Sequence, residues 1–73
     1  MKKQLSINAF KAALKRNNPK TCSLIYTKYG YYLITKKSQF YFRANTFIDR
    51  KEITDISKQL GYLLCSQETF LNA

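Results

Sequence analysis

The middle of this chain, residues 21–45, is dominated by Tyr, Phe, Ile, Leu and Thr, which favour β-strands. Two short polar segments interrupt it, Lys28-Tyr29-Gly30 and Lys36-Lys37-Ser38-Gln39, and both are typical of turns. Because the connections are short, neighbouring strands must run antiparallel. The pattern therefore predicts three strands, at about 22–28, 31–36 and 39–44.

Alternation in the third predicted strand indicates which face each side chain occupies. Phe40 and Phe42 should point into the core, so Tyr41 and Arg43 should point to the opposite face. The first two strands are apolar on both faces, and their register does not follow from the pattern. We expect Tyr26, Lys28, Tyr31, Thr35 and Lys37 to join Tyr41 on the outer face.

A helix is predicted before the strands, from about Ser6 to Arg16. Ser6 is a suitable N-cap, and Ile7, Phe10 and Leu14 follow at helical spacing. Asn17-Asn18-Pro19 should end this helix, because the residue before a proline is disfavoured in the helical conformation.

A second helix is predicted after the strands. Asp49 as N-cap and Glu52 three residues later match a capping box, and Ile48 and Ile53 stand at the positions of a hydrophobic staple. Gly61 is a natural C-cap. A short third helix is expected over Gln67–Leu71. The predicted fold is one α+β domain, residues 1–73, with a three-stranded antiparallel sheet that both helices cover on one face, in the order αβββα.

The charges are distributed unevenly along the chain. Every charged residue among the first 48 is positive, whereas the remaining 25 residues hold all four acids against three cations, for a total of +9. Such a chain presents a strong positive field, and a polyanion is the partner that this field favours. Nucleic acid, DNA or RNA, is the commonest polyanion in a cell.

The sequence therefore predicts a small nucleic-acid-binding protein that contacts phosphates. The first helix and the loop after it supply one basic surface, and the sheet supplies cations next to rings on which bases could stack. Lysines outnumber arginines, which favours phosphate contacts over base-specific reading. The predicted binding residues are Lys11, Lys15, Arg16, Lys20, Lys28, Lys37 and Arg43, with Tyr31 and Tyr41 as stacking rings.

The residues needed for catalysis are poorly represented. The chain has no histidine, which is the commonest general base, and only two glycines, too few for a phosphate-binding loop. Capping explains Asp49 and Glu52. Two cysteines without histidine fall short of the four ligands of a structural zinc site. We expect no enzyme activity, no cofactor and no metal.

Two partial resemblances are present. The order of elements is similar to that of double-stranded RNA-binding domains, in which the last helix begins with lysines; here only Arg50 and Lys51 correspond. Residues 53–62 resemble the first helix and turn of a helix-turn-helix motif, with Ser57 mid-helix and Gly61 at the turn. That resemblance implies a recognition helix from about Ser66, with Gln67 and Asn72 toward the bases.

An alternative function belongs to another class. A compact cation could dock on an acidic protein as an inhibitor or accessory factor, of the kind that phages and mobile elements encode, with its exposed tyrosines as anchors. Attachment of the first helix to an anionic membrane is a third hypothesis. The apolar residues Tyr62, Leu63, Leu64 and Phe70 are candidates for a homodimer contact.

The location of the protein is predicted from its apolar segments and cysteines. The chain has no uninterrupted apolar run that could act as a secretory signal or a membrane span. Cys22 and Cys65 lie in apolar stretches and are expected to be buried free thiols. We expect a cytoplasmic protein.

Overall fold

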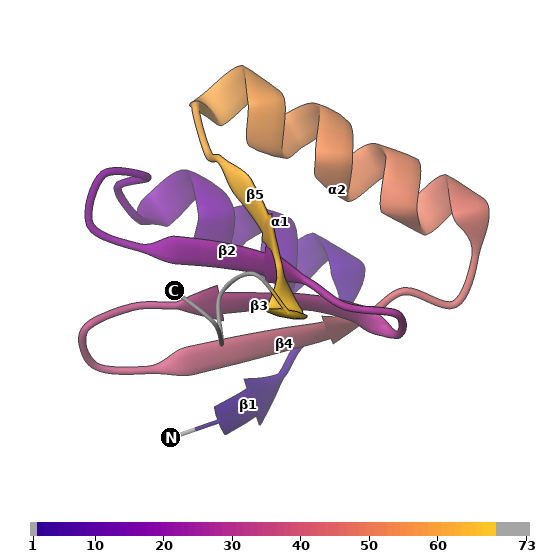
Figure 1. The fold of residues 1–73 in the computed structure, drawn as a ribbon, viewed down its shortest axis with the longest axis horizontal. Coiled ribbons are helices and arrows are strands. Elements are labelled where there is room, and N and C mark those ends of the chain that lie inside the picture. Colours follow the sequence, from indigo (N-terminus) through magenta and orange to yellow (C-terminus); the bar gives the residue numbers. More distant parts are fainter. Residues whose placement is uncertain (1, 69–73) are drawn as a thin grey trace.

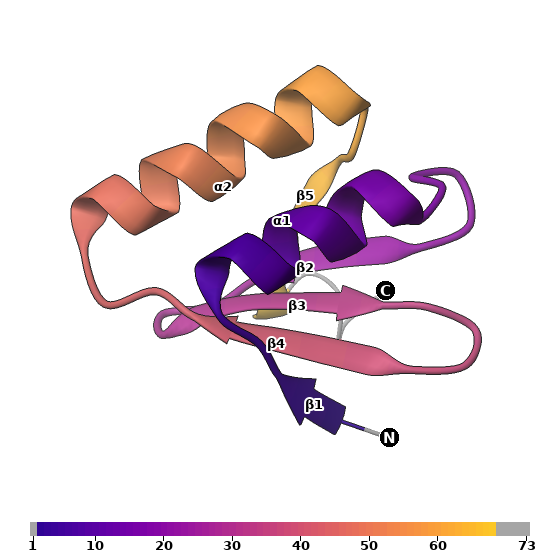
Figure 2. The same cartoon turned by 180° about the vertical axis from the view of Figure 1, so that it is seen from behind.

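The computed structural model describes residues 2–68, which form a five-stranded mixed sheet with two helices packed on one face (Figures 1 and 2). The strand order is β1-β4-β3-β2-β5. The elements are β1 (Lys2–Gln4), α1 (Ile7–Arg16), β2 (Ser23–Tyr26), β3 (Gly30–Ile34), β4 (Gln39–Arg43), α2 (Phe47–Leu60) and β5 (Leu64–Ser66).

The predicted three-stranded antiparallel sheet is wrong in strand number and in direction. The central strands β2, β3 and β4 do pair antiparallel. Two further strands extend the sheet and both run parallel to their neighbours: β1 pairs with β4, and β5 pairs with β2. Each added strand is three residues long. Backbone pairing with a distant segment makes these strands, and their own sequences carry no alternating pattern.

The register of the sheet determines which side chains face the helices. Tyr31 is opposite Phe42 and Leu33 is opposite Phe40, so all four side chains lie on the helix-covered face. Phe42 is buried and Phe40 packs against the core, which confirms their predicted orientation. Tyr41 lies on the other face, as predicted.

The prediction that Tyr26 and Tyr31 point to the outer face of the sheet is wrong. They are opposite each other in the β2–β3 ladder and share the helix-covered face with Phe42. Tyr31 is only 3% exposed, and its ring lies 6.5 Å from the ring of Phe10. A buried ring cannot serve as a stacking surface for bases.

Side chains from both helices meet the sheet in a single core. Phe10 and Leu14 of α1 and Ile53 of α2 are almost completely buried against Leu24 and Leu33. The apolar spacing predicted for the first helix is therefore confirmed. Full burial of a side chain of this size contributes about 1.5–3 kcal/mol to folding, so these contacts hold the two helices in place.

The ends of the helices agree with the predictions at three of four positions. Ser6 caps α1, with its Oγ accepting a hydrogen bond from the backbone N–H of Ala9 at 3.3 Å, and α1 ends at Arg16 as expected. Gly61 caps α2 with φ 90°, a conformation that favours glycine. Asp49 as the N-cap of α2 is wrong, because Thr46 takes that position and its Oγ1 accepts from the N–H of Asp49 at 3.1 Å. The staple is also wrong, since Ile48 is 69% exposed.

The segment after α2 does not follow the helix-turn-helix pattern. Residues Leu64–Ser66 form a strand that pairs with β2, where that motif would turn into its second helix. Of the helix expected over Gln67–Leu71, the part after Glu68 lies outside the described residues. The candidate dimer contact Phe70 also lies outside them. The two additional strands likewise remove the match to the element order of double-stranded RNA-binding domains.

Candidate functional site

The two hairpin turns of the sheet are built in the same way around a threonine. In the turn between β3 and β4, Thr35 Oγ1 accepts hydrogen bonds from the backbone N–H groups of Lys37 (3.3 Å) and Ser38 (2.9 Å). In the turn between β2 and β3, Thr27 Oγ1 accepts from Tyr29 and Gly30, each at 3.0 Å. Each threonine thus fixes a four-residue turn that carries one or two lysines in the middle.

The β3–β4 turn lies beside the loop that connects α1 to β2. Residues of both segments line one shallow hollow of about 210 Å³: Asn17, Thr21, Cys22, Thr35, Lys36 and Lys37. Figure 1 shows the loop, the turn and the end of α1 at the same end of the molecule. The fold therefore collects three segments that are separate in the sequence.

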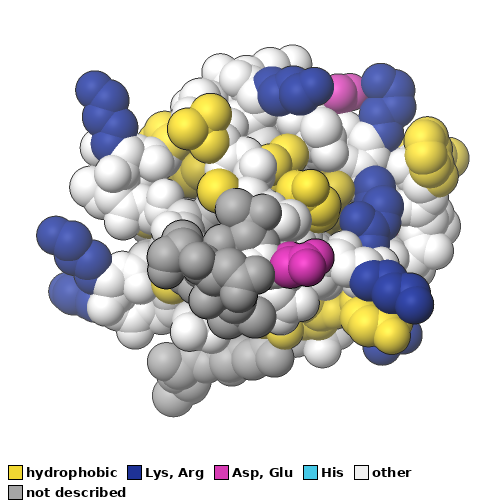
Figure 3. Space-filling model, in the orientation of Figure 1, with side chains coloured by type: hydrophobic (Ala, Val, Ile, Leu, Met, Phe, Trp, Pro, Cys, Tyr) yellow, Lys and Arg dark blue, Asp and Glu magenta, His cyan; other side chains and the backbone are white. Residues whose placement is uncertain are grey.

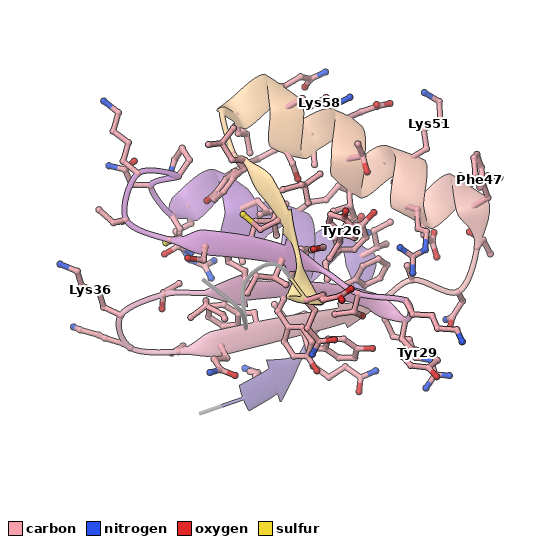
Figure 4. All side chains as sticks on the ribbon, viewed as in Figure 1. Tyr26, Tyr29, Lys36, Phe47, Lys51 and Lys58 are labelled. Carbon is pink, nitrogen blue, oxygen red and sulfur yellow. The ribbon has the colours of Figure 1, made fainter. Side chains whose placement is uncertain are left out.

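These three segments carry five cations, which we call the basic end: Lys15, Arg16, Lys20, Lys36 and Lys37. All five are exposed. Figure 4 labels Lys36 where it extends into solvent from this end. Lys15 and Arg16 occupy the last turn of α1, where the helix dipole favours positive charge. None of the five forms an ion pair with another residue of the range 2–68.

Local hydrogen bonds hold the loop of the basic end in one conformation. Asn17 Nδ2 donates to the carbonyl of Ala13 at 2.8 Å and closes the end of α1. Asn18 Oδ1 then accepts from the backbone N–H of Lys20 at 2.9 Å, and its carbonyl accepts from the N–H of Thr21 at 3.0 Å. The backbone that carries Lys20 is therefore preorganised.

Tyr62 attaches the end of α1 to the segment after α2. Its hydroxyl donates to the carbonyls of Leu14 (2.8 Å) and Asn17 (3.1 Å), and the residue is only 5% exposed. Burial, and to a smaller extent the nearby Cys22, raises the pKa of Tyr62 above its ordinary value of 10.0. Tyr62 thereby anchors the backbone at the end of α1, and no sequence pattern indicated this role.

The acidic residues lie outside the segments of the basic end. Asp49, Glu52 and Asp55 are all in α2, which begins at the opposite end of the molecule (Figure 1). Two of them are paired with lysines: Glu52 lies 3.0 Å from Lys11 and Asp55 lies 3.1 Å from Lys51. Glu68 lines a hollow beside Thr27 and Lys28, in the other hairpin turn. The basic end thus keeps its charge uncompensated by acids of its own segments.

The structure divides the predicted binding residues into groups. Lys15, Arg16, Lys20 and Lys37 come together at the basic end, and Lys36, which the prediction omitted, joins them. Its position in a lysine-containing turn was a signal that could have identified it. The other predicted residues lie elsewhere: Lys28 and Arg43 at the opposite end, Lys11 in an ion pair, Tyr31 in the core and Tyr41 on the sheet face away from the helices.

The sheet face away from the helices carries paired rings. Tyr41 is half-buried, and its ring centroid lies 4.7 Å from that of Tyr32 at an angle of 37°. Ile25 on the same face is 3% exposed. Tyr41 is therefore already engaged by a neighbouring ring, as expected for cross-strand aromatic pairs that stabilise a sheet.

Residues 2–68 contain no group of three or more His, Cys, Asp or Glu side chains that could hold a metal ion. Both cysteines are free; Cys22 is half-buried and Cys65 is exposed, so the expectation that both are buried is wrong. Neither described helix combines the length and apolar character needed to cross a membrane.

Comparison with known proteins identifies no relative. The chain matches no protein-family model, no curated protein and no solved structure. Its function must therefore be inferred from the arrangement of its own residues.

Proposed function

We propose that this protein binds nucleic acid through the phosphates, using the basic end as its contact surface. The observation that carries the proposal is that five exposed cations from three separate segments meet at one end, and that these segments contain no acid. A surface that serves only solubility usually mixes charges of both signs. A polyanion is the partner that compensates such a cluster.

The chemistry of the basic end favours contacts with the backbone of the nucleic acid. Four of its five cations are lysines, which act as point charges toward phosphate, whereas bidentate recognition of guanine is typical of arginine. The threonine-fixed turn and the hydrogen-bonded loop hold the backbone of Lys20, Lys36 and Lys37 before the ligand arrives. Preorganisation of this kind lowers the entropic cost of binding.

Fluorescence anisotropy of labelled single- and double-stranded DNA and RNA, titrated at several salt concentrations, tests the proposal. If all five cations contact phosphates, the logarithmic affinity–salt slope is about −4.5 for a duplex and about −3.5 for a single strand. Affinity for a duplex then falls about 500-fold between 50 and 200 mM salt.

A charge-reversal pair provides the decisive variant. Lys36→Glu combined with Lys37→Glu removes two of the five cations, so the duplex slope should decrease by about 1.8. The matched control is Lys28→Glu with Arg43→Glu, which changes the net charge by the same amount at the opposite end. The control should keep the wild-type slope. Equal losses in both variants would mean that net charge alone attracts the nucleic acid, and no binding at low salt would exclude the function.

A further inference from the structure

The cations of the basic end and the exposed rings of the protein lie at opposite ends of the molecule. Within residues 2–68 three rings are exposed: Phe47 (83%), Tyr29 (59%) and Tyr26 (42%). Figure 4 shows Tyr29 and Phe47 at the end away from Lys36. In Figure 3, dark blue side chains at the Lys36 end stand out from a mostly white surface, whereas yellow and dark blue side chains adjoin at the other end. The surface that attracts phosphates is therefore separate from the rings that could hold a base.

The three segments of the basic end contain no aromatic residue. They are the last turn of α1, the loop of residues 17–22 and the turn of residues 35–38. Tyr62, whose hydroxyl is bonded to the end of α1, is only 5% exposed. Tyr32 and Tyr41, on the sheet face away from the helices, are half-buried and contact each other. The basic end itself thus offers no ring face to an unpaired base.

The hollow between the loop and the β3–β4 turn does not have the lining of a base pocket. Its volume of about 210 Å³ lies below the range of about 300–1,000 Å³ that is usual for sites that enclose a ligand. Two lysines, two threonines, Asn17 and Cys22 line it. Proteins that extrude a base from a strand hold it between aromatic or apolar side chains instead. The chemistry of this hollow is that of a phosphate contact, with Lys36 and Lys37 as donors.

The exposed rings at the other end lie next to acidic residues. Tyr26 shares one hollow with Asp55 and another with Glu68. Lys28 Nζ lies 5.9 Å from the centre of the Tyr29 ring, so a cation of the protein already stands over that ring. A strand whose bases stacked on these rings would bring its phosphates against carboxylates, which is unfavourable.

We infer that the basic end binds the double-stranded form of nucleic acid, an inference that rests on the proposed function and adds the class of ligand. Binding of single strands without sequence preference combines phosphate contacts with bases stacked on rings, and the basic end provides only the first. A duplex keeps its bases stacked inside and presents about one negative charge per 1.7 Å of its axis. Cations on a preorganised backbone match a ligand whose phosphates are also fixed in position.

The salt dependence of binding sets the size of the expected preference. With five phosphate contacts, the logarithmic slopes for a duplex and for a single strand differ by about one unit. If the two forms bind equally at about 1 M salt, the duplex should bind about 20-fold more tightly at 50 mM and about fivefold more tightly at 200 mM. Stacking of even one base on a ring would offset about fivefold of this preference.

Fluorescence anisotropy of a duplex and of its own separated strands tests the inference. A length of about 12 base pairs, or about 40 Å, exceeds the largest dimension of the protein, which is 28 Å. DNA and RNA are both assayed, because their duplexes share the phosphate chemistry. A preference of the expected size for the duplex of either one supports the inference and identifies the duplex that is bound. Single strands that bind as tightly as both duplexes at 50 mM salt would overturn it.

The matched variants Lys20→Tyr and Lys20→Ala test the reason for the preference. The Lys20 side chain is exposed, and both replacements keep the backbone N–H that donates to Asn18, so the loop is preserved, as circular dichroism verifies. Both variants lose one cation and should bind the duplex equally. Lys20→Tyr adds a ring and should bind the single strand about fivefold more tightly than Lys20→Ala. Equal affinities of the two variants for the single strand would overturn the inference.

The variant Lys36→Glu with Lys37→Glu separates a failure of this inference from a failure of the proposed function. If no nucleic acid binds, or if binding is unchanged in this variant, both the proposed function and the inference are refuted. If binding depends on the two lysines but favours the single strand, only the inference is refuted.

Discussion

Replacement of Tyr62 by phenylalanine tests how the two helices are joined behind the basic end. The tyrosine hydroxyl is the hydrogen-bond donor to the carbonyls of Leu14, in the last turn of α1, and Asn17, its C-cap. The last carbonyls of a helix have no partner within the helix and depend on such donors. Tyr62→Phe removes the donor and keeps the ring.

The expected cost follows from the burial of this contact. The single hydroxyl proton is shared between the two carbonyls, so one three-centre hydrogen bond is lost, and leaving the buried Leu14 carbonyl without a donor costs about 1–3 kcal/mol. We therefore expect the free energy of unfolding to fall by about 2 kcal/mol. For a domain of this size that corresponds to a fall in melting temperature of about 8–16 °C.

Urea unfolding followed by far-UV circular dichroism measures the change directly. Because phenylalanine preserves the packing, the midpoint should fall while the denaturant slope remains at its wild-type value. Tyr29→Phe is the control, since Tyr29 is 59% exposed and its replacement should change stability by less than about 0.5 kcal/mol. If Tyr62→Phe is as stable as this control, the Tyr62 hydroxyl contributes nothing to the free energy of unfolding, and the reasoning is refuted.

Three further predictions address the same scaffold. The unfolded chain releases the Tyr62 proton near pH 10, whereas the folded protein retains it because burial raises the pKa. Above pH 10, the stability of the wild type should therefore fall more steeply than that of Tyr62→Phe. Melting temperature measured against pH checks this difference. Gly30→Ala places a Cβ against the backbone carbonyl of Phe42 and should cost at least about 2 kcal/mol in urea unfolding; a neutral result would contradict the close approach of β3 and β4. Thr35→Val removes the acceptor that fixes its turn and should cost about 1 kcal/mol. In the anisotropy assay it should also lower nucleic-acid affinity less than Lys36→Glu with Lys37→Glu, and unchanged values in both assays would refute the role of this hydroxyl.

The parts of the fold that follow from the sequence are those set by local chemistry. The Ser6 cap, the apolar spacing of α1 and the break before Pro19 each depend on residues within one or two turns of the helix. The two lysine-rich turns likewise mark the ends of β3 through their own residues. Such features are predictable because the interactions that form them span only a few residues.

The edge strands could not be found in this way. The residues of β1 are polar, and those of β5 follow a capped helix without any alternation. Each becomes a strand only because an edge of the sheet offers unpaired backbone groups at that point; the N–H of Leu5, just after β1, donates to the carbonyl of Tyr41 at 2.8 Å. Contacts between segments so far apart leave no trace in a local pattern.

The placement of Tyr31 failed because its strand has no period of two. Gly30–Ile34 contains four large apolar residues in succession, so either set of alternate side chains could face the core. A shift of one residue moves every side chain to the other face. The pairing with Phe42 and Tyr26 decides the choice, and it directs Tyr31 inward.

The N-cap of α2 shows a competition between two adequate signals. Asp49 with Glu52 is a capping box, but Thr46 can also cap, and it starts the helix three residues earlier. With Thr46 as the cap, α2 gains backbone hydrogen bonds and Asp49 enters its first turn, where the helix dipole favours a carboxylate. The earlier cap therefore retains the benefit of the acidic residue and makes a longer helix.

The linear charge pattern indicates an excess of cations but not where the fold gathers them. In an antiparallel sheet, successive hairpin turns lie at opposite ends, so Lys28 and the pair Lys36 and Lys37 are separated by the length of β3 even though they are close in sequence. The end of α1 then adds its cations to one of these turns. The fold thus converts one uniformly positive stretch into two basic regions with different neighbours. One lies among polar loop residues, and the other lies beside Tyr26, Tyr29 and Phe47. This difference is why we propose a phosphate backbone as the ligand of the first region.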